Sequence, residues 1–303
     1  MDRYRLYFSN NSKDIIKFYN SFGKPEELFD FLSQMPKESV KTTILRNDDR
    51  IVIVVPTADI NNGNAKRIKN VYKDYTIILV ESRGKFFNFS YSMNVGIEKA
   101  ITLNPSWIII TNDDVYPQNT NNLTEKLEKI NKDIIIPRKI QYEKSEVTTE
   151  INIYKSSRFL NLLYRIAPLS NLFPIYLKGR FLCNSINYYK NMLKYLNINA
   201  DSYFNRLFFV GKKIVSVYNI QPVSIIRAKV LRDFKFDQIF QNGGEDLDLS
   251  LRLKKAGLSF YPLDLVYLGQ TGSTLGINYV RLYRNTLVEI LYISYKIYNH
   301  MYE

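Results

Sequence analysis

Residues 51–57 read IVIVVPT, five β-branched residues followed by proline and threonine. A continuous apolar run without polar alternation is typical of a strand that is buried on both faces of a parallel sheet. The stretch therefore predicts a buried strand that enters a loop at Pro56 and Thr57.

The sequence on the carboxyl side of this run repeats the same pattern. Helical character is expected for residues 63–73 and 90–102, and further apolar strands for residues 76–80, 106–111 and 134–136. Strands that alternate with helices at this spacing predict a doubly wound α/β fold. The expected fold class is therefore α/β, with a Rossmann-like, mostly parallel sheet flanked by helices.

Polar residues follow three of the predicted strands. They are Thr57 and Asp59, then Glu81 and Arg83, then Asp113 and Asp114. Because α/β sheets bind ligands outside the carboxyl ends of their strands, we expect these residues to converge. The acids of Asn112-Asp113-Asp114 are candidate metal or phosphate-binding groups, although the same tripeptide is also typical of a turn.

A second acidic motif lies in residues 236–257, FDQIFQNGGEDLDLSLRLKKAG. Glu245 and Asp246 follow a Gly-Gly turn, which allows backbone to approach a ligand closely, and open an amphipathic helix that ends near Gly257. A carboxylate at such a place is a candidate general base. The alternative is a pair of acids that only stabilise the helix dipole.

Composition limits the chemistry of the site. The 303-residue chain has one cysteine, Cys183, and one histidine, His300. These counts exclude an internal disulfide, a four-cysteine zinc site, a histidine-based triad and a multi-histidine metal site. A metal would be held mainly by oxygen atoms, which favours Mg²⁺ or Mn²⁺.

The net charge of +13 indicates anionic partners, such as nucleotide phosphates or an anionic membrane surface. The basic residues are spread along the chain and form no nucleic-acid-binding motif, so specific nucleic-acid binding is not expected.

Residues 151–200 contain no acid. They are interpreted either as core helices with solvated cations or as an acceptor-side surface on a membrane. With no signal peptide or apolar run of about 18 residues, we expect a cytoplasmic protein, peripheral on the membrane in the second case.

Six segments, in this order, resemble family 2 glycosyltransferases of the GT-A fold, and in particular their rhamnosyltransferase-like branch. They are IVIVVPTAD, IILVESRG, NFSYSMNVGIEKA, IIITNDDVYP, the Glu-Asp stretch and YVRLYRN. The resemblance covers roughly residues 50–286. It implies a GT-A domain over residues 49–275, with residues 151–200 inserted on the acceptor side, an N-terminal helical extension over 1–48 and a C-terminal helix over 276–303. We expect that last helix to pack on the domain or on a second subunit, as in a homodimer.

The resemblance also implies an inverting transfer of a sugar from a nucleotide-diphosphate donor to a glycan, a lipid-linked or a protein acceptor. Asp246 would be the general base, and Glu245 would orient or bind the acceptor. Asp114 would bind Mn²⁺ or Mg²⁺, with Asp113 beside the metal and the ribose or sugar. The remaining candidates for donor contacts are Thr57, Asp59, Glu81, Arg83 and Asn88.

Three positions depart from the family pattern. Asn112 stands where the metal motif begins with an acid, Glu81 replaces an aspartate, and no histidine occurs near Leu268. Metal dependence is therefore a weaker expectation than the fold. The alternative function is a nucleic-acid- or nucleotide-binding protein of the same fold without transferase activity.

Overall fold

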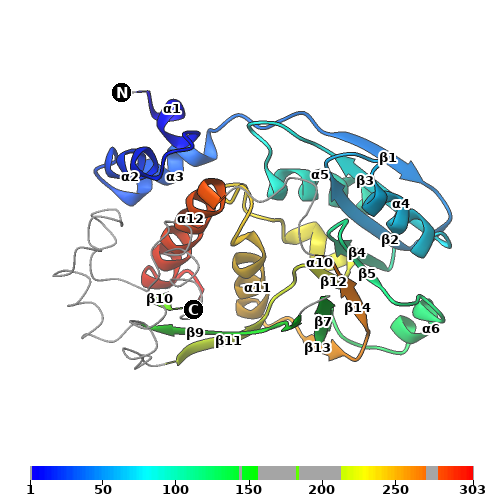
Figure 1. The fold of residues 1–303 in the computed structure, drawn as a ribbon. Helices are drawn as coiled ribbons and strands as arrows, with labels where there is room; N and C mark the ends of the chain where they lie inside the picture. Colours follow the sequence, from blue (N-terminus) through cyan, green and yellow to red (C-terminus); the bar gives the residue numbers. More distant parts are fainter. Residues whose placement is uncertain (1, 143–144, 156–181, 184–212, 271–278, 303) are drawn as a thin grey trace. The chain divides into compact units, whose positions relative to one another are not determined.

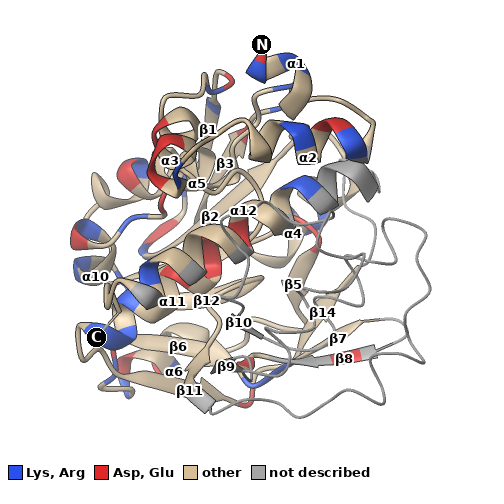
Figure 2. Cartoon of the chain, turned by 90° about the vertical axis from the view of Figure 1, so that its left-hand side faces the viewer, with Lys and Arg blue, Asp and Glu red and all other residues tan. Residues whose placement is uncertain are grey.

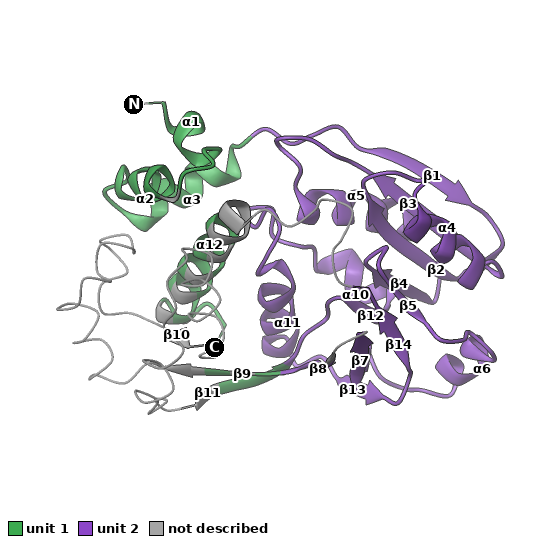
Figure 3. Cartoon of the chain, viewed as in Figure 1, with its two compact units in different colours: residues 1–35, 151–217, 277–303 green, residues 36–150, 218–276 purple. Residues whose placement is uncertain are grey.

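A computed structural model describes residues 2–142, 145–155, 182–183, 213–270 and 279–302 (Figure 1). The predicted acid-free surface, residues 151–200, lies outside the described residues except for 151–155 and 182–183. The chain divides into two compact units (Figure 3). Unit 1 comprises residues 1–35, 151–217 and 277–303, and unit 2 comprises residues 36–150 and 218–276.

Unit 2 is built on a seven-stranded sheet with the order β1-β3-β2-β4-β12-β6-β13. Its strands are β1 (Lys41–Leu45), β2 (Asp48–Thr57), β3 (Tyr75–Glu81), β4 (Trp107–Thr111), β6 (Ile134–Pro137), β12 (Val223–Arg227) and β13 (Phe260–Leu263). Five strands run in one direction, whereas β1 and β12 run in the opposite direction. This arrangement confirms the expected α/β class and the mostly parallel sheet.

Helices cover both faces of this sheet. They include α4 (Gly63–Val71), α5 (Phe89–Ile101), α10 (Ala228–Asp233) and α11 (Glu245–Lys255). Val52 and Val54 pack on the face that also receives residues of α5, α10 and α11. Ile51, Ile53 and Val55 pack on the opposite face, with Ile68 of α4. Both sides of the β2 run are therefore buried, as its uninterrupted apolar sequence predicts.

Helix α5 lies very close to the sheet at Gly96. A Cβ atom at this position would clash with the side chains of Val54 on β2 and Val80 on β3. Glycine is therefore required here by close packing. This contact sets the distance between α5 and the two strands that carry Thr57 and Glu81.

Two features of the sheet were not predicted. Strand β1 lies within the segment expected to be helical and pairs antiparallel with β3 at one edge. Strand β12 inserts antiparallel between β4 and β6. A smaller sheet joins β5 (Val115–Pro117), β14 (Tyr267–Gly269), β7 (Lys139–Tyr142) and β8 (Ser145–Thr148), and α6 (Leu123–Glu128) follows β5.

Unit 1 begins with three helices, α1 (Arg3–Tyr7), α2 (Ser12–Asn20) and α3 (Pro25–Ser33). Pro25 occupies the first position of α3. The unit also includes most of β9 (Glu150–Lys155) and β11 (Lys213–Tyr218), with β10 (Leu182–Cys183), in a three-stranded sheet. The C-terminal helix is α12 (Tyr279–Tyr298), and Phe29 of α3 contacts its Tyr292 with ring centroids 4.5 Å apart.

None of the helices in the described part of the chain is both long enough and apolar enough to cross a membrane. Lysine and arginine residues occur on many different elements rather than on one (Figure 2).

Candidate functional site

The acidic turn, residues 112–114, follows β4 at the carboxyl edge of the central sheet. Asp113 is 6% exposed, and its Oδ2 accepts a hydrogen bond of 2.8 Å from Thr57 Oγ1 at the end of β2. Asn62, which caps α4, donates from Nδ2 to Thr57 Oγ1 over 3.3 Å and to Asp113 Oδ2 over 3.5 Å. The ends of β2 and β4 therefore meet through side-chain hydrogen bonds, as the strand pattern predicts.

Asp114 has an unusual pKa. Its burial and the nearby charge of Asp113 raise its pKa to about 6. Its carbonyl oxygen accepts a hydrogen bond of 2.9 Å from the backbone N–H of Gln270, just after β14. Two neighbouring carboxylates with little compensating positive charge form a place that favours a bound cation.

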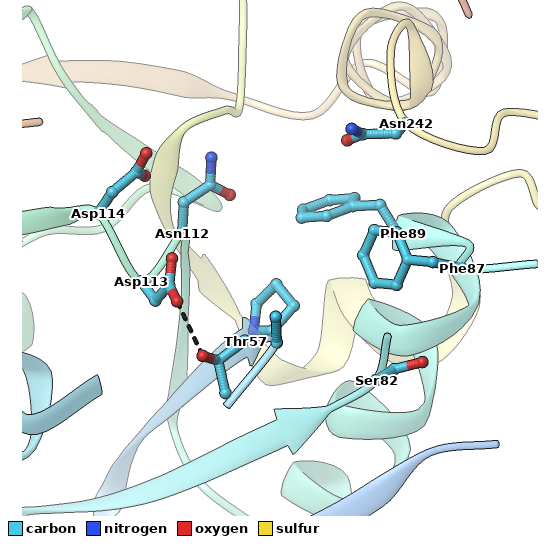
Figure 4. A pocket seen from close by; sticks show the side chains of 10 residues that line it. Thr57, Ser82, Phe87, Phe89, Asn112, Asp113, Asp114 and Asn242 are labelled. Atoms are coloured by element: carbon cyan, nitrogen blue, oxygen red, sulfur yellow. Dashed lines mark hydrogen bonds between the residues drawn. The ribbon is translucent and has the colours of Figure 1, made fainter. Parts of the chain in front are cut away.

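A cavity of about 120 Å³ opens beside the acidic turn and is lined by residues from four parts of unit 2 (Figure 4). The lining residues are Pro56, Thr57, Ala58, Ser82, Phe87, Phe89, Asn112, Asp113, Asp114 and Asn242. The two phenylalanine rings lie across the cavity from Asn112 and Asp113, and Asn242 lies on the side of the phenylalanines (Figure 4). One wall is therefore aromatic and the other is polar, which suits a ligand with a flat apolar part and a charged part.

The donor atoms of the acidic turn fit a hard divalent cation. Asn112 Oδ1 is buried and has no hydrogen-bond partner among the described residues, so the turn offers a third oxygen next in sequence to the two carboxylates. The described residues hold no cluster of three or more His, Cys, Asp or Glu side chains with metal-binding geometry. Mg²⁺ is usually bound by one or two carboxylates together with substrate phosphates and water, and such a site needs no larger protein cluster.

The other residues predicted at the strand ends have different surroundings. Glu81 ends β3, is half-buried, and has its Cα paired with that of Thr57. Asp59 Oδ1 accepts from Asn61 N over 2.8 Å in the loop after β2. Arg83 is exposed. The three strand ends are neighbours, yet of the predicted residues only Thr57, Asp113 and Asp114 line this cavity.

Asn88 holds the loop before α11 rather than lining the cavity. Its Oδ1 caps α5 through Tyr91 N at 2.8 Å, and its Nδ2 donates to Gln238 O at 2.9 Å. Asn94 exchanges two hydrogen bonds of 2.9 Å with the backbone of Phe236. Helix α5 thus fixes residues 236–241 and, through them, the start of α11.

The second acidic motif opens α11, as predicted. Gly243 and Gly244 have φ angles of 140° and 89°, a backbone conformation that favours glycine, and they form the turn before the helix. Glu245 is 6% exposed, and its Oε2 accepts from Gly243 N over 2.5 Å. Acids occupy the first turn of the helix and bases its last turn, which favours both ends of the dipole (Figure 2).

The two carboxylates of this motif differ in environment. Burial, followed by the charge of Asp246, raises the pKa of Glu245 to about 8. Burial also raises the pKa of Asp246, but the hydrogen bond from Asn219 and backbone N–H groups oppose that increase. Asp246 Oδ2 accepts from Asn219 Nδ2 over 2.6 Å, and Oδ1 from Leu247 N over 2.8 Å. The raised pKa favours the protonated form of Glu245, and the donors that bind Asp246 favour a negative charge there.

A short stretch of backbone, residues 219–222, contacts both acidic motifs. Asn219 binds Asp246 at one end, and the carbonyl oxygen of Pro222 accepts a hydrogen bond of 3.1 Å from Asn112 N at the other. An extended chain rises at most about 3.6 Å per residue, so the α-carbons of Asn219 and Pro222 are at most about 11 Å apart. The two acidic motifs, more than 100 positions apart in the sequence, therefore lie near each other in unit 2.

Several residues of this site were not predicted. Asn219 and Phe87 belong to none of the quoted motifs, whereas Asn242 and Phe89 lie within quoted segments but had no predicted role. Asn62 carries a local signal, because an asparagine before a helical run is a common N-cap. The other four are placed by contacts with distant parts of the chain.

No protein-family model matches this sequence, and no curated protein sequence matches it. Among solved structures, the chain is similar to one described as "Crystal structure of S. aureus TarS 1-349", with a TM-score of 0.40 and 8% sequence identity. The similarity covers 83% of this chain and 73% of that chain.

Proposed function

We propose that the protein is an inverting glycosyltransferase that moves a sugar from a nucleotide-diphosphate donor to a glycan, a lipid-linked or a protein acceptor. One observation carries the proposal: residues 219–222 join the acidic turn to the acids of α11. Two carboxylate pairs then lie near each other in unit 2. A transferase needs two such groups, one for the leaving group and one for the acceptor.

In this proposal the acidic turn holds Mn²⁺ or Mg²⁺. Asp114 is the main ligand, with Asp113 and the Asn112 Oδ1 oxygen beside it. These residues would hold the cation, and a cation bound there would supply Lewis-acid stabilisation of the diphosphate leaving group. Asp113 is held in place by Thr57, so the carboxylate does not have to reorient when the donor binds.

Asp246 is the proposed general base. Inversion requires a base on the face of the sugar opposite the leaving group, and one carboxylate is sufficient. Asn219 and the N–H groups at the start of α11 favour the ionised form of Asp246 and oppose the effect of burial on its pKa. Glu245, with its raised pKa, keeps a proton and can donate a hydrogen bond to the acceptor or orient it.

The nucleotide part of the donor is assigned to the cavity beside the acidic turn. Phe87 and Phe89 offer aromatic faces to a base or ribose, and Thr57 and Ser82 are polar neighbours. Asp59, Glu81 and Arg83 surround the same strand ends and remain candidate contacts for the parts of the donor that extend beyond the cavity.

A thermal-shift screen tests the proposal. UDP, dTDP and GDP, with UDP-glucose, UDP-N-acetylglucosamine, dTDP-rhamnose and GDP-mannose, are added with and without Mn²⁺. We expect at least one nucleotide to raise the unfolding temperature, and more strongly with Mn²⁺. The same ligands tested on Asp114→Ala should give little Mn²⁺-dependent increase. The absence of a shift with any nucleotide, with or without the cation, would refute the proposed function.

A further inference from the structure

Gln221 has a buried side-chain amide that the protein does not satisfy. The residue is 8% exposed, and neither Nε2 nor Oε1 has a hydrogen-bond partner among the described residues. Buried amides are nearly always paired, because an unpaired donor or acceptor loses its bonds to water without replacement. An amide with both ends unpaired therefore requires an explanation.

The backbone around Gln221 is firmly held. Ile220 N donates to Ser250 Oγ of α11 over 3.1 Å, and Ser250 Oγ in turn donates to Asp246 O over 2.7 Å. On the other side, Pro222 O accepts from Asn112 N. Gln221 is thus fixed in residues 219–222, and its side chain is the part of this segment without a polar partner in the described residues.

The position of Gln221 suggests which part of a substrate it would meet. The diphosphate belongs at the acidic turn, and the acceptor hydroxyl belongs at Asp246. The sugar that is transferred must lie between these two points, and Gln221 lies between the residues that contact them. Phosphate groups favour arginine, lysine or a metal. A neutral amide instead offers both donors and an acceptor, which matches a sugar hydroxyl.

From these observations we infer that Gln221 is a specificity-determining residue that hydrogen-bonds a hydroxyl group of the transferred sugar. The inference rests on the proposed glycosyltransferase function and names a residue for recognition of the donor sugar. A site built to pair with a hydroxyl rejects analogues that lack it, since the amide would again be left unpaired. The residue is kept polar at the expense of stability in the free protein, as is common at functional sites.

Other buried polar atoms without a partner provide a comparison. Ser224 is fully buried on β12, and its Oγ also has no hydrogen-bond partner among the described residues. It is three positions from Gln221, and its Cα pairs with that of Ile110 on β4. Ser224 therefore supplies a matched control, a buried unpaired group near Gln221 that the inference does not assign to the sugar.

The experiment compares wild type, Gln221→Met and Ser224→Ala by calorimetry with Mn²⁺. Each protein is titrated with the nucleoside diphosphates UDP, dTDP and GDP and with the four nucleotide sugars of the screen. We expect wild type to bind one nucleotide sugar more tightly than its nucleoside diphosphate. In Gln221→Met this gain should fall by about tenfold, while affinity for the nucleoside diphosphate is unchanged. Ser224→Ala should keep the full difference in affinity between the nucleotide sugar and its nucleoside diphosphate.

Stability separates this role from a purely structural one. Methionine has a similar length without unpaired polar atoms, so the unfolding temperature of ligand-free Gln221→Met should be equal to or above that of wild type. The inference would be overturned if Gln221→Met kept the full increase in affinity that the sugar adds to the nucleoside diphosphate. So would a wild-type protein that binds the nucleoside diphosphates but gains nothing from any attached sugar. A wild-type protein that binds no nucleotide at all refutes the proposed function itself.

Discussion

Asn219 donates a hydrogen bond of 2.6 Å to Asp246, across 27 positions of sequence, and no other side chain in the described residues donates to that carboxylate. The contact joins the strand region before β12 to the first turn of α11. It favours the ionised form of Asp246, because a hydrogen-bond donor stabilises a carboxylate more than a carboxylic acid. A carboxylate held in one orientation by a donor that favours its ionised form is suited to accept a proton.

Replacing Asp246 tests the proposed base directly. Asp246→Asn keeps the shape of the side chain but removes its ability to take up a proton. Transfer should fall by about 10²–10⁴-fold, because general-base catalysis typically contributes this much. Calorimetry should show nucleotide binding close to that of wild type. Transfer near the wild-type rate would show that the base is a different residue.

Replacing Asn219 tests the positioning of that base. Asn219→Leu removes the donor, so the pKa of Asp246 should rise. Because the base acts only when ionised, the acidic limb of the pH–rate profile should move to higher pH. Charge-assisted hydrogen bonds are stronger than neutral ones, and a loss of roughly tenfold in kcat is expected below the new pKa. Asn219→Asp would add a negative charge and should shift the limb further in the same direction. An unchanged pH profile in both variants would remove Asn219 from the mechanism.

The pKa of Asp114 predicts how cation binding depends on pH. The carboxyl group has a pKa of about 6 without a cation, and it must ionise to bind one. Mn²⁺-dependent nucleotide binding should therefore weaken as pH falls below about 6, with proton release on binding near this pH. Asp114→Asn should remove this pH dependence together with most of the Mn²⁺ effect. Asp264→Asn is a suitable control, because that acid pairs with Arg138 and its side chain is 84% exposed.

Glu245 predicts a pH-dependent effect on stability. Its pKa is raised in the folded protein, so folding favours the protonated form and stability falls as pH rises from about 4.5 to about 8. Below this window the carboxyl is protonated in both states and contributes no difference. Glu245→Gln removes the titration and can still accept from Gly243 N. In urea unfolding it should match wild type near pH 4 and be more stable than wild type at pH 8. A constant difference across this range would contradict the raised pKa.

The sequence predicts the parts of the fold that depend on local patterns. The apolar runs of β2, β3, β4 and β6 are long and rich in β-branched residues, so both their existence and their burial follow from composition. The acids at their ends follow from the rule for parallel sheets. The Gly-Gly turn and the following helix are equally local signals.

Other features depend on distant partners and could not be predicted. Strand β1 has a short, partly exposed sequence, and it is a strand because β3 offers a free edge. The antiparallel direction of β12 is set by its place between β4 and β6. Asn219 and Gln221 are ordinary residues in sequence. Their roles arise from contacts, or missing contacts, that only the folded chain contains.

The close approach at Gly96 has a consequence for evolution of the site. Helix α5 rests on Val54 and Val80 with no space for a methyl group, and the same helix anchors residues 236–241 through Asn88 and Asn94. A single added carbon in the core would displace the helix. These asparagines would then transmit the displacement to residues 236–241 and to the start of α11. Natural variation at residue 96 should therefore be restricted as tightly as at the acids themselves, although the glycine touches neither donor nor acceptor.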